Sequence, residues 1–417
     1  MITELRAQNF KSWQDTGNLR FAPLTAFFGA NSSGKTSILQ VLLMLKQTAE
    51  RPAHWNEPLY FGDEESLVNL GSFDDVIHRP ANNTSLDISV SWNPIEQHLP
   101  SPVSFSTSIA KKDERADLVE FCYTRNGGNF KIKWTPQGYR FISFHEQIKI
   151  EPFRCYGIVE PDTRLDENLK AFFLTRQDAF ESLFRGIHYL GPLRENPRHR
   201  YTWEGDHPAD VGQQGEKAIP ALLSGRVQLR FIEKKILEWL QRLDLIDDYR
   251  IEPDQKEKRR YELYVTKYRG GPEVHLTDVG FGVSQVLPVL TQCYYPPEGS
   301  ILILEQPEAH LHPKAQSVLA DVLIDVVKNR NIQIILESHS ENLLIRLMRR
   351  IAEEKIPTED TALYSCQINE GVSEIEQLKM DVYGNISNWP QDFFGDEMGD
   401  LAAKAKAEIK RRKANKQ

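Results

Sequence analysis

The sequence predicts a mixed α/β fold in which both ends of the chain build one main sheet and a β-rich lobe with helices is inserted between them. An apolar run at residues 24–28 leads through a glycine-rich loop into an apolar helix, and further apolar runs at 301–304 and 332–336 end in polar residues. Residues 84–160 instead contain short alternating runs separated by turn residues, which indicates a β-rich insertion. The 417 residues are enough for two folding units.

Composition and charge narrow the class of protein. Hydrophobic residues make up 40% and charged residues 26% of the chain, as in ordinary soluble proteins. The formal net charge of -8 argues against a wholly basic nucleic-acid coat, so we expect any nucleic-acid contact to be local. The 4 cysteines lie far apart without C-x-x-C spacing, which predicts neither a zinc site nor a disulfide framework. With no signal sequence and no apolar run of ~20 residues, we expect a cytoplasmic protein without a membrane segment.

The strongest local signal is the octapeptide Gly29–Thr36, which matches the pattern G-x-x-x-x-G-K-[ST] between a predicted strand and a predicted helix. Such a match arises by chance in roughly one chain of this length in a hundred. The glycines let backbone N–H groups surround phosphates, Lys35 reaches the β- and γ-phosphates, and the Thr36 hydroxyl faces Mg²⁺. We therefore predict ATP and Mg²⁺ as cofactors. The residues expected at the nucleotide are Gly29, Asn31, Ser32, Ser33, Gly34, Lys35, Thr36 and Ser37.

The segment Asn9-Phe10-Lys11-Ser12, ahead of this loop, makes the N-terminal region resemble the opening of SMC-like ATPases. That group includes the recombination and DNA-repair members of the ABC ATPase class and the OLD (overcoming lysogeny defect) nucleases. The resemblance implies an ABC-class, AAA-family ATPase head with an SMC-like fold. One departure is Ser32, which stands where many members have glycine. The Q-loop glutamine of the family is not assigned, since Gln40 and Gln47 fit ordinary helix positions.

The insertion is predicted to be compact. Alternating segments such as 86–90, 130–134 and 139–144 continue its β-rich pattern, and residues 165–184 and 219–245 are predicted to be helical. The sequence has no long heptad repeat of the kind that the coiled-coil arm of an SMC protein needs. The expected divisions are the N-terminal part of the ATPase domain at 1–80, the inserted β-rich and helical lobe at 81–270, the C-terminal part of the ATPase domain at 271–380, and a C-terminal extension with a basic tail at 381–417.

Two charged stretches within the insertion each have a functional and a structural interpretation. Residues 191–201 concentrate arginines in a turn-rich segment, which suits contact with the phosphates of a nucleotide or a nucleic acid. We favour a structural loop whose arginines pair with carboxylates. Residues 249–265 are predicted to form a hairpin, and its charged tip at 254–260 is most simply a solvated run.

A second glycine-rich segment, 276–288, opens another apolar helix. Two glycines, a serine and a glutamine at its start suit a close approach of backbone N–H groups to phosphate. By its place in the chain it resembles the ABC signature loop, and it is nearer to the glycine-rich variant of the OLD-like group than to Leu-Ser-Gly-Gly-Gln. The resemblance implies that a facing protomer contacts the nucleotide through Gly280, Gly282, Ser284 and Gln285.

The strand at 301–304 ends in Glu305, as in a Walker B motif whose strand-end carboxylate holds Mg²⁺. The next position, normally a glutamate that serves as general base, holds Gln306, whose amide cannot accept a proton as a carboxylate does. Either Glu308 substitutes for it or hydrolysis is slow. His310 and His312 follow, and with no third ligand in view we interpret them as structural rather than as metal ligands.

A buried strand at 332–336 is followed by Glu337-Ser338-His339-Ser340. Here His339 resembles the switch histidine of ABC ATPases, which senses the γ-phosphate. The motifs therefore occur in the order P-loop, signature, Walker B and switch. The predicted catalytic group is Glu305, Gln306, Glu308 and His339, with Thr36 and Glu305 as the metal ligands.

The end of the chain carries an aromatic and acidic segment at 383–394. It resembles a C-terminal extension of a bacterial subgroup of these ATPases, found among predicted phage-defence proteins. Residues 401–417 are predicted to be a helix in which lysines and arginines far outnumber acids. This tail either binds nucleic acid or an acidic partner, or is a solvated end of the chain.

The leading hypothesis is an ATPase that acts as a nucleotide-dependent switch in a bacterial antiphage defence or DNA-maintenance complex. We expect a homodimer or higher homo-oligomer joined through the ATP sites, with a separately encoded nuclease or toxin as effector. An OLD-type nuclease-associated ATPase is less favoured, because only about 80 residues follow His339 and they lack that family's clustered acids. A transporter ATPase subunit is disfavoured by the missing standard signature and by the large insertion.

Overall fold

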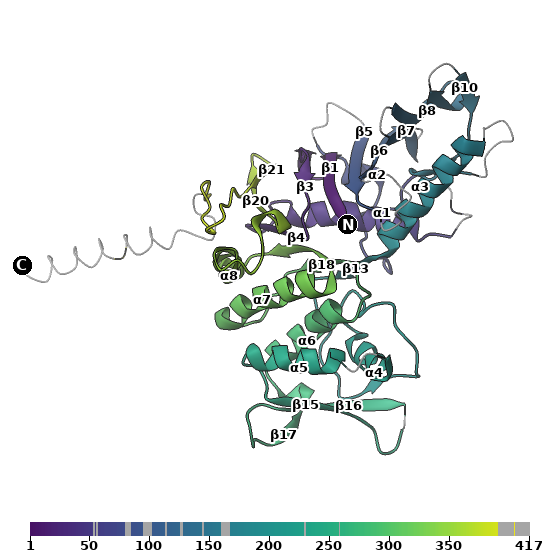
Figure 1. Cartoon of the computed structure of the whole chain (residues 1–417). Helices are drawn as coiled ribbons and strands as arrows, with labels where there is room; N and C mark the ends of the chain where they lie inside the picture. The colour runs from purple at the N-terminus through teal and green to yellow at the C-terminus, as the bar shows by residue number, and fades with distance from the viewer. Residues whose placement is uncertain are drawn as a thin grey trace, which may run out of the picture.

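A six-stranded main sheet lies at the centre of the computed structural model (Figure 1). Its strand order is β13-β18-β19-β4-β20-β21, in which the first five strands are parallel and β21 pairs antiparallel with β20. These strands are β13 (Ile187–Leu190), β18 (Ile301–Glu305), β19 (Gln333–Ser338), β4 (Leu24–Gly29), β20 (Thr361–Asn369) and β21 (Val372–Gln377). The structure describes residues 1–52, 55, 57–79, 85–94, 102–112, 115–125, 128–143, 146–159, 167–228, 231–257, 259–390 and 404.

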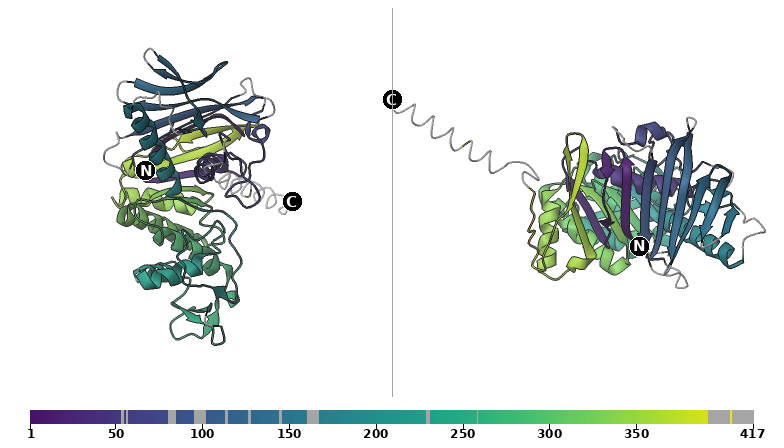
Figure 2. Two further views of the ribbon diagram at one scale, coloured as in Figure 1. Left: turned by 90° about the vertical axis from the view of Figure 1, so that its right-hand side faces the viewer. Right: turned by 90° about the horizontal axis from the view of Figure 1, so that it is seen from above.

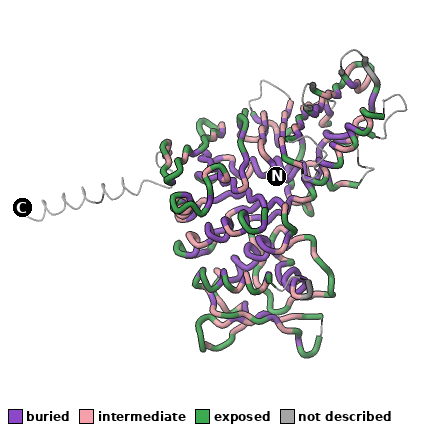
Figure 3. Tube along the Cα trace, viewed as in Figure 1, coloured by how far each residue is buried: buried purple, intermediate pink, exposed green. Residues whose placement is uncertain are grey.

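The main sheet is buried on both faces, which explains why its strands are continuous apolar runs. Successive residues alternate between two hydrophobic clusters: Phe27 and Ile335 belong to one, and Phe28 and Leu336 to the other. The buried segments accordingly concentrate in the middle of the molecule (Figure 3). The first cluster includes α1 (Lys35–Ala49) and α3 (Glu167–Arg185), and the second includes α6 (Phe281–Tyr294), α7 (Pro313–Arg330) and α8 (Glu341–Ala352).

The predicted β-rich lobe is a nine-stranded antiparallel sheet, in the order β10-β9-β8-β7-β6-β5-β1-β2 with β3 beside β1. It includes β1, which precedes the P-loop, so this sheet joins residues on both sides of the boundary expected at 80/81. Its strands and the short elements beside it are β1 (Ile2–Phe10), β2 (Trp13–Asp15), β3 (Leu19–Arg20), α2 (Phe73–Val76), β5 (Ser85–Trp92), β6 (Val103–Lys112), β7 (Arg115–Arg125), β8 (Gly128–Thr135), β9 (Gly138–Ser143), β10 (Glu146–Lys149), β11 (Pro152–Phe153) and β12 (Gly157–Ile158).

A smaller region lies on the opposite side of the main sheet (Figures 1 and 2). The helix predicted at 219–245 is two helices here, α4 (Ala218–Gln228) and α5 (Phe231–Arg242), and the predicted hairpin is β15 paired with β16. Strand β13 separates this region from the β-rich lobe along the chain, so the insertion contributes a strand to the main sheet. The remaining elements here are β14 (Tyr201–Thr202), β15 (Asp248–Pro253), β16 (Arg260–Thr266), β17 (Glu273–His275) and η1 (Leu276–Asp278).

The C-terminal part follows β21 with a loop in which Met380 pairs with Ile386. The helix predicted at 401–417 lies outside the described residues apart from Lys404. Within the described part of the chain, no helix combines the length and the apolar character needed to cross a membrane. All four cysteines are buried and free.

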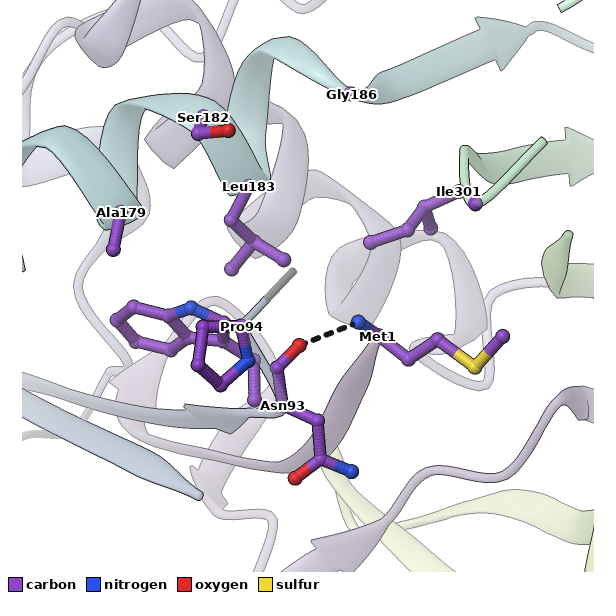
Figure 4. Close-up of a pocket in the computed structure, with 10 residues that line it drawn as sticks. Met1, Asn93, Pro94, Ala179, Ser182, Leu183, Gly186 and Ile301 are labelled. Atoms are coloured by element: carbon purple, nitrogen blue, oxygen red, sulfur yellow. Dashed lines mark hydrogen bonds between the residues drawn. The ribbon is translucent and has the colours of Figure 1, made fainter. Parts of the chain in front are cut away.

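A small cavity lies beside the N-terminus, between the end of β5, α3 and the start of β18 (Figure 4). The terminal ammonium of Met1 donates a hydrogen bond to the carbonyl oxygen of Asn93 at 3.0 Å, and burial lowers the pKa of this amine. The cavity volume of about 30 Å³ has room for one or two water molecules. This space is too small for a nucleotide.

Candidate nucleotide-binding site

The predicted phosphate-binding loop lies between the end of β4 and the first turn of α1. Its backbone has positive φ angles at three positions: 143° at Gly29, 61° at Ser32 and 93° at Gly34. A Cβ atom at Gly29 would lie 2.1 Å from the carbonyl oxygen of Cys366, so only glycine fits there. Ser32 holds the left-handed conformation that glycine adopts at lower cost. Ser32, where many members of the resembled group have glycine, therefore adopts a backbone conformation that glycine favours.

The Lys35 side chain is buried and folds back into this loop. Its ammonium donates hydrogen bonds to the carbonyl oxygens of Ala30 (2.6 Å) and Gly29 (3.1 Å), and to Oγ of Ser33 (3.3 Å). Burial lowers the pKa of Lys35, while the charge of Glu337 opposes that shift. The loop thus holds a cation among backbone carbonyls at the N-terminus of a helix, where phosphate oxygens are attracted.

A polar cleft of about 380 Å³ opens over the loop, within the size range of small-molecule sites. It brings the P-loop together with Gln306 and His339, two of the predicted catalytic residues. Gln40, interpreted from the sequence as an ordinary helix residue, also lines it and accepts a hydrogen bond from Lys11 at 2.6 Å. The lining residues are Lys11, Ser12, Asn31, Ser32, Ser33, Gly34, Lys35, Thr36, Ser37, Gln40, Gln306, Glu337 and His339.

Two neighbouring strand ends place carboxylates beside this cleft. Glu305 at the end of β18 and Glu337 near the end of β19 are opposite each other in the parallel pair. The hydroxyl of Thr36 donates a hydrogen bond to Oε2 of Glu337 at 2.7 Å, and the hydroxyl of Tyr189 donates one to Oε1 of Glu305 at 2.9 Å. Burial and the charge of Glu337 raise the pKa of Glu305 to about 7. Two ionised carboxylates at Glu305 and Glu337 are therefore unfavourable in this buried place.

Mg²⁺ fits this set of donors. Thr36 supplies a hydroxyl and Glu305 supplies a carboxylate, and oxygen ligands of this kind are those that Mg²⁺ prefers. A divalent cation would also offset the charge that raises the pKa of Glu305. Among the described residues, no group of three or more His, Cys, Asp and Glu side chains could hold a metal. We therefore expect the ion to depend on phosphate oxygens and water for its remaining ligands.

The other predicted catalytic residues surround the end of β19. Oε1 of Glu308 accepts hydrogen bonds from Oγ of Ser338 (2.8 Å) and from the backbone N–H of His339 (2.7 Å), and burial raises the pKa of Glu308. Nε2 of His339 lies 3.8 Å from Oε1 of Glu337, and burial lowers the pKa of His339. The backbone N–H of Gln306 donates to the carbonyl oxygen of Glu337 at 2.9 Å. Glu308 lies outside the residues that line the cleft, whereas Gln306 and His339 line it.

The predicted signature segment lies at the N-terminus of α6, apart from the residues that line the cleft. Gly280 is exposed, with a φ of -56° and open space where a Cβ would stand, and Phe281 is 63% exposed. Gly282 is half-buried, while Ser284 and Gln285 are buried, and Oγ of Ser284 donates to the carbonyl oxygen of Phe281 at 2.9 Å. Within one chain, the structure does not bring this segment together with the P-loop.

Both histidines after the Walker B strand make local contacts. Nδ1 of His312 accepts a hydrogen bond from the backbone N–H of Lys314 at 3.3 Å and so caps α7. The ring of His310 lies 6.3 Å from the ring of Phe281. These contacts agree with the structural interpretation of the two side chains.

Sequence reasoning missed three side chains near Glu305: Tyr189, Arg194 and Glu337. Nη2 of Arg194 donates to the carbonyl oxygen of Glu305 at 3.1 Å, and burial lowers the pKa of Arg194 to about 10. Its Nε and Nη1 are buried without a hydrogen-bond partner in the part of the chain that the structure describes. All three lie at or just beyond the carboxyl ends of parallel strands. Because ligands bind at this edge of such sheets, that position could have identified them as candidates from the sequence.

The arginine-rich stretch therefore divides into two parts. Arg194 donates to the carbonyl oxygen of Glu305, while Arg198 pairs with Glu195 and Arg200 pairs with Glu262 (3.1 Å). The last two contacts fit the structural interpretation of this stretch, and the position of Arg194 fits neither of the two interpretations considered.

Family models of AAA-type ATPases match successive parts of the chain. An AAA ATPase domain model matches residues 1–158. An AAA domain model whose description names the AbiEii toxin and type IV toxin–antitoxin systems matches residues 153–346. A model described as a protein of unknown function (DUF3696) matches residues 356–403, which overlap the predicted C-terminal extension. The two AAA models, with the P-loop between β4 and α1, agree with the expectation of an AAA-type ATPase.

Similar solved structures include several SMC head domains. A head bound to the C-terminal winged-helix domain of ScpA is 13% identical with a TM-score of 0.48, and the match covers 91% of this chain and 98% of that one. The SMC head domain from Thermotoga maritima is 12% identical with a TM-score of 0.41, over 91% of this chain and 99% of that one. A comparison with curated protein sequences gives no match.

Proposed function

We propose that this AAA-type ATPase binds ATP with Mg²⁺ in the cleft over the P-loop, hydrolyses it slowly, and uses bound ATP to join two copies of the chain. Lys35 would bind the phosphates, and Thr36 and Glu305 would hold the metal. We expect slow hydrolysis because Gln306 stands at the position where these ATPases normally carry a carboxylate base, so any base must act from a different position. His339, which lines the cleft beside Lys35, would sense the γ-phosphate.

The observation that carries this proposal is the separation of the two nucleotide-contacting segments. The P-loop cleft is lined by the P-loop, the β1–β2 turn, the start of α1 and residues at the ends of β18 and β19, while Gly280 and Phe281 are exposed at the start of α6. A second copy related by two-fold symmetry would bring its own signature segment over this cleft and receive the same contact in return. Two complete sites would form in one step, with ATP between the copies.

A role in bacterial defence is the favoured setting for this switch. The description of the AAA domain model that matches residues 153–346 names a toxin of a toxin–antitoxin system, which supports this choice over DNA maintenance. Association and release of two copies would control a separately encoded nuclease or toxin, because ATP shifts the population between two arrangements. By its charge, the basic sequence beyond residue 400 would bind a nucleic acid or an acidic partner.

A complementation experiment tests the shared site. Lys35→Ala disables the P-loop of a chain, and Gly280→Arg blocks its signature segment. Arginine fits at position 280 without strain, because φ is -56° and the space is open, whereas the buried Ser284 has no room for one. Each variant alone should be inactive, while an equal mixture should regain about one quarter to one half of wild-type ATP hydrolysis, since each mixed dimer keeps one intact site. A mixture that stays inactive although sizing shows mixed dimers would refute the shared site.

A further inference from the structure

The cleft contains one acidic side chain that the sequence motifs did not assign, Glu337. The position that usually carries the general base of such ATPases holds Gln306, so the acid that serves the hydrolysis step has to come from elsewhere. Of the three acids at the ends of β18 and β19, only Glu337 belongs to the described lining of the cleft. Its side chain is 4% exposed, so its carboxylate is well shielded from bulk water.

Two contacts fix the position of this carboxylate. Oε2 accepts the 2.7 Å hydrogen bond from Thr36, and Oε1 lies 3.8 Å from Nε2 of His339. Its backbone is held as well, because the strand pairs with Glu305 on one side and with Phe27 on the other. The carboxylate therefore lies between the P-loop hydroxyl and the residue expected to face the γ-phosphate.

The alternatives are held in other roles. The Glu308 carboxylate accepts hydrogen bonds from Ser338 and from the backbone of His339, so it anchors the turn that carries His339. The Glu305 carboxylate accepts the hydrogen bond from the hydroxyl of Tyr189. Neither carboxylate lines the described cleft, where an attacking water would have to stand.

We propose that Glu337 is the general base of ATP hydrolysis in this protein, an inference that rests on the proposed ATPase function. A water held by Glu337 attacks the γ-phosphorus with an electron pair of its oxygen. The bond from the γ-phosphorus to the bridging oxygen breaks, and its electron pair stays on ADP. Glu337 takes a proton from the water, inorganic phosphate leaves, and the proton passes to solvent. Glu337, on the neighbouring strand β19, thus supplies the carboxylate that Gln306 lacks.

Glu337→Gln tests the role with little change in shape, because a glutamine carbonyl can still accept the hydrogen bond from Thr36. We expect the single-turnover rate of hydrolysis to fall by about 10²- to 10⁴-fold, the usual contribution of a general base. The affinity for labelled ATP with Mg²⁺ and the Mg²⁺ concentration needed for binding should stay within about 3-fold of wild type. The matched control is Glu341→Gln, which makes the same change at an acid in the first turn of α8 that does not line the cleft. This variant should hydrolyse ATP at the wild-type rate.

Three results would overturn the inference. The first is hydrolysis by Glu337→Gln at the rate of the control, and the second is a larger loss of the hydrolysis rate in Glu308→Gln than in Glu337→Gln. The third is a raised Mg²⁺ requirement for ATP binding by Glu337→Gln, which would make Glu337 a metal ligand. If Glu337→Gln does not fold, Glu337→Asp keeps a carboxylate but withdraws it, and an unchanged rate there contradicts the assignment equally. Failure of the ATPase function itself looks different, because wild type would then bind ATP no better than Lys35→Ala.

Discussion

The P-loop cleft and the signature segment are built in opposite ways. In the cleft, polar groups already have partners within the chain: Lys35 donates to the loop, and Thr36 donates to Glu337. At the start of α6, Gly280 and Phe281 are exposed, and in the part of the chain that the structure describes no residue other than the chain neighbours of Gly280 comes within 4 Å of its Cβ position. We therefore propose that a single chain holds the phosphates, and that the exposed start of α6 contacts the nucleotide bound by a second copy. Substitutions in the P-loop cleft should therefore weaken ATP binding by a single chain. Substitutions in the signature segment should leave that binding intact and weaken only the association of two chains.

The largest effect is expected from Lys35→Met, which keeps the length of the side chain but removes its charge. ATP affinity should fall at least ~100-fold, because charge-assisted hydrogen bonds to phosphate contribute on the order of 1.5–3 kcal/mol each. Titration of labelled ATP onto the isolated chain measures this, with thermal unfolding as a check of folding. The exposed lysine change Lys328→Met is the matched control and should bind normally. Unchanged affinity in folded Lys35→Met would show that the cleft is not the phosphate site.

How far the sequence predicts this cleft depends on the distance between its parts along the chain. The P-loop and the strand ends at Glu305 and His339 are local patterns, because each is a strand followed by a characteristic turn. The roles of Tyr189, Arg194 and Glu337 are not local, because they arise only when β13, β18 and β19 become neighbours in one sheet. No single segment encodes that adjacency.

The same limit explains the differences in the fold. The run at 187–190 has the composition of a strand but does not reveal which sheet it joins, and it joins the main sheet beside β18. Residues 219–245 are predicted from the sequence to be one helical stretch, and the structure places separate helices at Ala218–Gln228 and Phe231–Arg242. The β-rich lobe was easier to predict, because each hairpin pairs neighbours in sequence.

A smaller effect should appear in the stability of the nucleotide-free protein. Burial and the charge of Glu337 raise the pKa of Glu305 from 4.5 to about 7, so ionising Glu305 disfavours the folded state. Below pH 4.5 the acid is neutral whether the chain is folded or unfolded, and the stability lost by ionisation grows as the pH rises to about 7. Glu305→Gln should therefore gain about 1–3 kcal/mol over wild type at pH 8 and much less at pH 5.

Urea unfolding in the absence of Mg²⁺ and nucleotide measures that difference. The gain should shrink when Mg²⁺ and a non-hydrolysable ATP analogue are added to wild type, because a cation offsets the charge of the two acids. A stability difference between Glu305→Gln and wild type that is the same at pH 5 and pH 8 would mean that burial and the charge of Glu337 do not raise the pKa of Glu305.

The central claim is that ATP joins two copies of this chain through the P-loop cleft and the signature segment. Light scattering measures it directly, as the molar mass of the 48.0 kDa chain with and without Mg²⁺ and a non-hydrolysable ATP analogue. The mass of wild type should double on adding the analogue, while Gly280→Arg should bind the analogue and keep the mass of one chain. A wild-type mass that does not respond to the analogue, or a Gly280→Arg variant that doubles as wild type does, would contradict the claim.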